Sequence, residues 1–147
     1  MGDESTPQVS HRNERGHVAF YPLQMLIRDE QEQLVKPWIG ALMDEYSRVV
    51  EWQMTVKPGA ELLQGVLTKY ISRFGKPGTL VLPSSYPADD TLLGTCQKLS
   101  IRVDQLDYAN PFGICEDFFK RMHTELIAQL PGSLLSSVRS SQNFALL

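Results

Sequence analysis

Short apolar runs alternate with polar turns through the first third of the chain, a pattern typical of β-strands that follow one another closely. An aromatic and aliphatic stretch covers residues 17–28, although Pro22 cannot donate to a strand ladder. An apolar run at 38–43 and a third stretch at 49–56 follow, separated by polar segments at 29–33 and 44–48. The pattern predicts a meander of three antiparallel strands.

From residue 57 onward the apolar spacing changes to that of helices. Lys57-Pro58-Gly59 interrupts the chain before a segment whose apolar residues recur at intervals of three and four and form one stripe. These residues are Leu62, Leu63, Val66, Leu67, Tyr70, Ile71 and Phe74. The turn at 75–78, rich in glycine and containing a proline, ends this helix.

The remaining elements alternate between strand and helix. The short apolar run 80–82 is typical of a central strand buried on both faces, and 101–106 alternates as a further strand. Helices are predicted over 89–99 and 116–130, the second ended by Pro131-Gly132. A meander followed by parallel strands with covering helices predicts an α/β, ribonuclease-H-like fold: a five-stranded mixed sheet flanked by helices.

Size and composition favour a single globular domain. The chain has 147 residues, 42% of them hydrophobic and 21% charged. We expect a flexible tail over 1–16, one domain over 17–132, and a loosely ordered tail over 133–147. No apolar run approaches the roughly 18–20 residues that span a bilayer. The first residues lack the apolar stretch of a signal peptide, so we expect a cytoplasmic protein without membrane contact.

Cysteine usage and charge narrow the possible chemistry. Cys96 and Cys115 both fall in helical patterns and are most simply packed thiols, and no zinc-type spacing occurs. The net charge of −3 argues against a strong nucleic-acid binder, because phosphate binding usually needs a basic face. Aromatic residues at strand and helix spacing fit core packing better than base stacking. They are Tyr21, Trp38, Tyr46, Trp52 and Tyr70.

Five landmarks in consistent order carry a family resemblance. They are Lys36-Pro37-Trp38, the DEYSR segment 44–48, the FGKP segment 74–77, the GICE segment 113–116 followed by Phe119, and the LPG segment 130–132. Together they make residues 17–132 resemble the catalytic core of the retroviral-integrase superfamily, with the bacterial transposase branch as the nearest likeness.

The resemblance implies a three-carboxylate metal site, and this chain departs from it. In the family, two aspartates and a glutamate hold two divalent metals, Mg²⁺ or Mn²⁺, for DNA strand transfer. The matching positions here are Ala19, Pro83 and Glu116, so only the glutamate is kept. Alanine and proline supply no ligand atom, and one carboxylate cannot anchor two metals. We therefore expect a vestigial site with no bound metal and no cofactor.

Other acids could in principle substitute. Asp44 is interpreted as a turn or strand-end residue close to Ser47 or Arg48. Asp89 and Asp90 suit the start of a helix, where the helix dipole favours negative charge. An active nuclease using Asp44, Asp89 or Asp90, and Glu116 remains the enzyme alternative.

Two residues that follow Glu116 on the same helical face are candidate DNA contacts. Lys120 and His123 lie four and seven positions further along the chain. In active relatives a basic residue at the first of these positions approaches DNA phosphate. The alternative, which we favour for Lys120, is an ion pair with Glu116 on a solvated face.

The sequence thus indicates an integrase- or transposase-type core that is catalytically inactive and acts by binding. Its partner would be DNA, bound weakly, a transposase-like protein, or a second copy of the chain. A protein-interaction module without nucleic-acid binding is the third alternative.

Overall fold

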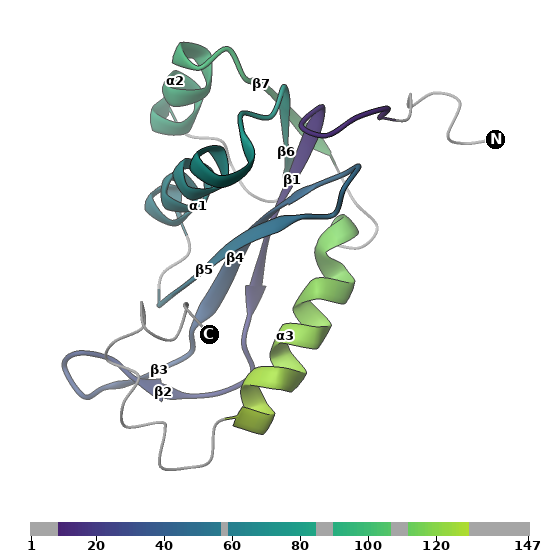
Figure 1. Cartoon of the computed structure of the whole chain (residues 1–147). Helices are drawn as coiled ribbons and strands as arrows, with labels where there is room; N and C mark the ends of the chain where they lie inside the picture. Colours follow the sequence, from purple (N-terminus) through teal and green to yellow (C-terminus); the bar gives the residue numbers. More distant parts are fainter. Residues whose placement is uncertain (1–8, 57–58, 85–89, 107–111, 130–147) are drawn as a thin grey trace.

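The computed structural model describes residues 9–56, 59–84, 90–106 and 112–129, and within them one mixed sheet forms the centre (Figure 1). The sheet has five strands in the order β5-β4-β1-β6-β7. Their bounds are β1 Arg15–Pro22, β4 Trp38–Asp44, β5 Val50–Thr55, β6 Thr79–Pro83 and β7 Arg102–Leu106. The helices are α1 Ala60–Phe74, α2 Asp90–Lys98 and α3 Glu116–Gln129, with a short 3-10 turn, η2 Gly113–Cys115, leading into α3.

The strand pairing confirms the predicted fold. β1 pairs antiparallel with β4, and β4 pairs antiparallel with β5, which is the expected meander. On its other edge β1 pairs parallel with β6, and β6 pairs parallel with β7. The chain is therefore a ribonuclease-H-like α/β domain with β1 at the centre of the sheet.

The two faces of the sheet carry separate cores. Figure 1 shows α1 and α2 on one side of the sheet and α3 on the other. Side chains alternate along β1: Val18 packs in the cluster that contains α1 and α2, whereas Ala19 belongs to the cluster that contains Cys115 and Phe119. The amphipathic stripe predicted for α1 is found, since Leu63, Val66, Leu67 and Tyr70 of that helix are buried.

Residues just before position 17 take part in the described fold. β1 begins at Arg15, and the Asn13 side chain is held by α1. Its Nδ2 donates to the main-chain oxygen of Phe74 (2.8 Å), and its Oδ1 accepts from the Tyr70 hydroxyl (2.9 Å). A polar residue without a periodic pattern gives no sequence signal of such tertiary contacts. Residues 1–8 and the predicted C-terminal tail 133–147 lie outside the described residues.

The predicted first strand is divided in the structure. β1 ends at Pro22, which has no main-chain N–H to extend the ladder. The chain then forms a small ribbon of β2 (Ile27–Arg28) and β3 (Leu34–Val35), closed by the polar turn that the sequence predicted. Leu26 and Leu34 of this ribbon region are 45% and 55% exposed.

Two further expectations about side chains have different outcomes. Cys96 and Cys115 are free and buried, as predicted. Tyr46, expected in the core, is 56% exposed because it lies in the turn after β4 and not on a sheet face. No helix in the described ranges is long and apolar enough to cross a membrane.

Candidate functional site

The two positions that match the family's aspartates lie on neighbouring strands. Ala19 is in β1 and Pro83 ends β6, and the two strands are paired in parallel. The register joins Arg15 to Thr79 and His17 to Val81, and Ala19 and Pro83 each lie two residues beyond the last of these pairs. The adjacency expected from the family resemblance is therefore present.

Both positions also face the same side of the sheet. Leu80 and Leu82 pack in the core beneath α1, so alternation along β6 directs Pro83 to the opposite face. That is the face on which Ala19 joins the cluster with Phe118 and Phe119 of α3. The position of Glu116 agrees with this frame, because it is the first residue of α3, directly after Cys115, whose thiol contacts the main-chain oxygen of His17 (3.9 Å).

Apolar and aromatic groups occupy the space beside the first aspartate position. Ala19 is only 1% exposed. Two residues further along β1, the Tyr21 ring stacks on Phe119 with 5.1 Å between ring centroids and meets Phe112 edge-on at 5.1 Å. Phe112 and Phe119 contact each other at 5.7 Å. A metal bound by carboxylates requires oxygen ligands, whereas the described side chains packed around Ala19 are apolar or aromatic.

Glu116, the remaining acid, is paired with a base on its own helix. Lys120 Nζ lies 3.3 Å from Glu116 Oε2, and the two side chains are 68% and 40% exposed. This is the i, i+4 ion pair that the sequence predicted. A pair so open to water contributes little to stability. It does partly neutralise the only carboxylate kept from the family's triad.

His123 has a partner that the sequence did not indicate. The Tyr21 hydroxyl and His123 Nδ1 are 2.7 Å apart, and the two rings meet edge-on. The hydrogen bond joins the end of β1 to the middle of α3. No local pattern could reveal it, because the residues are 102 positions apart in the sequence.

Asp44 is a structural residue, as the sequence interpretation held. It is 0% exposed at the end of β4. Its Oδ1 accepts the main-chain N–H of Asn13 (2.8 Å), and its Oδ2 accepts the main-chain N–H (2.7 Å) and the hydroxyl (2.8 Å) of Ser47. Burial, followed by the charge of Asp44, raises the pKa of the neighbouring Tyr70 to about 12. Both oxygens of Asp44 are thus committed to hydrogen bonds within the fold.

The alternative acidic set is not assembled in its form with Asp90. Asp90 begins α2, which packs on the α1 side of the sheet, whereas Glu116 begins α3 on the opposite side. Asp89 lies outside the described residues. In the described ranges, no group of three or more His, Cys, Asp or Glu residues is arranged to hold a metal ion. The described residues at the site therefore include no set of ligands for a two-metal centre.

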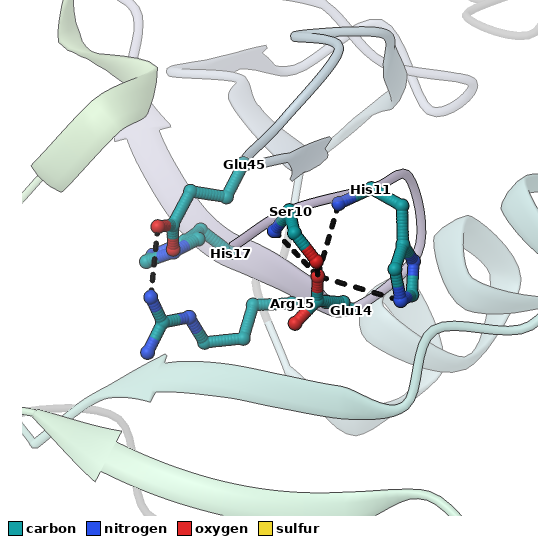
Figure 2. Close-up of polar contacts among 6 residues, drawn as sticks. All are labelled: Ser10, His11, Glu14, Arg15, His17 and Glu45. Atoms are coloured by element: carbon teal, nitrogen blue, oxygen red, sulfur yellow. Dashed lines mark hydrogen bonds and ion pairs between the residues drawn. The ribbon is translucent and has the colours of Figure 1, made fainter. Parts of the chain in front are cut away.

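A second polar cluster lies at the start of β1 (Figure 2). Glu45 accepts from Arg15 (2.9 Å) and is 2.6 Å from Nε2 of His17, which is only 7% exposed. Burial lowers the pKa of His17, against the opposing effect of Glu45. Burial alone would raise the pKa of Glu45, but hydrogen bonds from His17 and Arg15 outweigh it and leave that pKa lowered. Figure 2 also shows Glu14 accepting from Ser10 and His11.

Comparisons with known proteins bear on the fold. No known family and no curated protein sequence matches the chain. Solved structures do. The HTLV-2 integrase catalytic core domain in complex with magnesium matches in its dimeric form with a TM-score of 0.62 at 16% identity. Its trimeric form matches with a TM-score of 0.63 at 14% identity, and both matches cover 95% of this chain and 86% of the integrase core.

A larger assembly gives a similar result. A chain of the simian T-cell lymphotropic virus intasome, in complex with the PP2A regulatory subunit B56 gamma, matches with a TM-score of 0.64 at 14% identity. The match covers 90% of this chain but only 49% of that chain, so this protein spans about half of its length. At these identities the comparisons establish a ribonuclease-H-like fold of the integrase-core type.

Proposed function

We propose that the chain is a catalytically inactive integrase- or transposase-type core that acts by binding DNA or a partner protein. One observation carries the proposal: Ala19 and Pro83, which the family resemblance matches to its two aspartates, lie on strands that pair in parallel. On that resemblance, two of the three carboxylates of a two-metal site are replaced by side chains that cannot ligate a metal.

The local packing supports the loss of catalysis. Ala19 is buried in an apolar cluster that includes Phe119, so the described residues of its own cluster offer a metal no oxygen ligand. Glu116 is paired with Lys120 on the surface of α3. A carboxylate in such a pair is an ordinary surface group, and its affinity for Mg²⁺ or Mn²⁺ should not exceed that of other surface acids.

Binding is the function that we propose in place of catalysis. Lys120 and His123 on α3 are the proposed DNA contacts, and the net charge of −3 makes that binding weak and salt-sensitive. Exposed Leu26 and Leu34, near the β2–β3 ribbon, favour a protein partner, either a transposase-like protein or a second copy of the chain. The two buried free cysteines fit a reducing compartment, and we place the protein in the cytoplasm.

A cleavage and binding assay tests the proposal. The protein is incubated with labelled duplex DNA and Mn²⁺, and both strand cutting and binding are measured at several salt concentrations. We expect no cutting, and binding that weakens steeply with salt if DNA is the partner. Metal-dependent cutting that disappears in Glu116→Gln would overturn the proposal of an inactive core.

The partner-protein alternative has its own measurement. Self-association is followed by analytical ultracentrifugation for the unchanged chain and for Leu26→Ser with Leu34→Ser. Loss of a dimer in the double variant would support a self-partner at the ribbon, because both leucines are exposed there. Lys36→Ser, an exposed change close to the ribbon in sequence, serves as the control.

A further inference from the structure

A groove lies between the end of β1 and α3. Its volume is about 660 Å³, and the described residues that line it are Tyr21, Lys120, His123, Thr124 and Ala128. Small-molecule sites in proteins are typically clefts of roughly 300–1,000 Å³ with a mainly apolar lining and a few placed polar groups. The volume of the groove falls within that range, although the groove is wide and open to solvent, with Lys120, Thr124 and Ala128 exposed.

The polar groups of the groove come from one helical face. Lys120, His123 and Thr124 are spaced at i, i+3 and i+4, so successive turns of α3 present them together. Lys120 supplies a positive charge on a side chain that is 68% exposed. The Thr124 hydroxyl can donate or accept a hydrogen bond. The set contains donors and a cation but no carboxylate among the described lining residues.

The hydrogen bond between Tyr21 and His123 orients the imidazole. When the Tyr21 hydroxyl donates to Nδ1 across their 2.7 Å separation, the ring proton stays on Nε2, which then becomes a donor. An anion in the groove favours this tautomer. The Tyr21 ring is itself fixed by stacking on Phe119, so the imidazole has a rigid partner.

The ion pair with Glu116 does not block this use of Lys120. The two charged groups are 3.3 Å apart with side chains 68% and 40% exposed, and such open pairs are easily exchanged for another partner. The Tyr21 ring and the Ala128 methyl group provide the apolar part of the lining. A ligand that contacts both the polar and the apolar residues described in the lining combines an anionic group with a flat apolar body.

We propose that this groove binds a small organic anion of that kind, an aromatic carboxylate or aromatic phosphate ester. The anionic group contacts Lys120, the Nε2–H of His123 and the Thr124 hydroxyl, and the aromatic body packs on Tyr21 and Ala128. This site shares Lys120 and His123 with the proposed DNA contact but takes a different ligand, so small anions and duplex DNA are tested on it separately.

Matched probes test the proposal by nuclear magnetic resonance titration of the full chain. 2-Naphthoate supplies the carboxylate, 2-naphthyl phosphate supplies the phosphate ester, and 2-naphthamide has the same body without charge. We expect one or both anions to shift the resonances of His123 and Thr124 saturably, with the neutral amide at least about tenfold weaker. Comparison of the affinities of the two anions identifies the preferred head group.

Paired variants on α3 assign the effect to the groove. Lys120→Gln should weaken binding of the better anion about tenfold, because a charged hydrogen-bond partner is lost. Arg121→Gln removes the same charge from the next position, which does not line the groove, and should leave the affinity unchanged. Both residues are exposed, so neither change threatens folding.

Several results would overturn the proposal. They are equal affinity for the amide and the anions, shifts that map away from α3, and equal losses in Lys120→Gln and Arg121→Gln. Binding of duplex DNA at these resonances with no response to either small anion would assign the face to nucleic acid instead. The cleavage assay is separate from this titration, so failure of one does not decide the other.

Discussion

Replacing Asp44 by alanine should destabilise the domain strongly, with no connection to metal. The side chain is 0% exposed and accepts hydrogen bonds from the main-chain N–H groups of Asn13 and Ser47 and from the Ser47 hydroxyl. Alanine leaves two main-chain donors of partly buried residues without this acceptor, at a position that is itself fully buried. A buried donor without a partner costs roughly 1–3 kcal/mol, and hydrogen bonds to a charged group lie at the upper end of that range.

Two such donors and the lost hydroxyl contact amount to about 3–5 kcal/mol, since the contributions overlap and do not add fully. That is a large part of the roughly 5–15 kcal/mol by which a domain is stable. The position of Asn13 increases the effect, because the same residue also bonds Tyr70 and the main chain of Phe74. Asp44→Ala therefore loosens the start of β1 from the end of α1.

Urea denaturation, followed by circular dichroism, measures the loss. Asp29→Ala is the matched control, because the Asp29 carboxylate also accepts two main-chain N–H groups, of Gln31 and Gln33, but in the exposed hairpin turn. There water replaces the lost acceptor, and we expect a change below about 1 kcal/mol. Equal losses in the two variants would refute the reasoning. So would a loss in Asp44→Ala that Mn²⁺ alters, since that would make Asp44 a metal ligand.

Three further predictions concern the former site and its surroundings. Ala19→Asp with Pro83→Asp should lower the melting temperature in chelator, because carboxylates would be buried close together, and Mn²⁺ should restore part of it. Equal melting temperatures with and without metal would argue against a former metal frame. Calorimetric titration with Mg²⁺ or Mn²⁺ should detect no specific binding site, and a site that is lost in Glu116→Gln would contradict this. Glu116→Gln itself should alter the free energy of unfolding by less than about 1 kcal/mol. The pKa of His17 is lowered from 6.5 by burial, so the unfolded chain takes up a proton first as the pH falls. Stability should therefore be full above about pH 6.5 and decline below it, and His17→Gln should flatten that decline in denaturation curves measured from pH 7 to about pH 5.

The sequence by itself determined the order and type of the elements. Apolar runs and stripes of fixed period report which face of a strand or helix is buried, and this is why β4, α1 and α3 lie close to their predicted ranges. The ion pair of Glu116 with Lys120 was predictable for the same reason, because residues four positions apart on a helix are neighbours. The expected places of Ala19 and Pro83 came from the family resemblance, and the strand pairing agrees with them.

Only the tertiary structure decided which distant side chains meet. The hydrogen bond of Tyr21 with His123 joins residues 102 positions apart, and Asn13 reaches Tyr70 over 57 positions. Such contacts depend on how the helices pack against the sheet, which no local period encodes. Tyr46 was wrongly expected in the core: it belongs to the polar segment 44–48, which forms the turn after β4, and there no sheet face covers its ring. The groove beside α3 also depends on the tertiary structure, because its lining combines the end of β1 with a helix near the other end of the domain sequence.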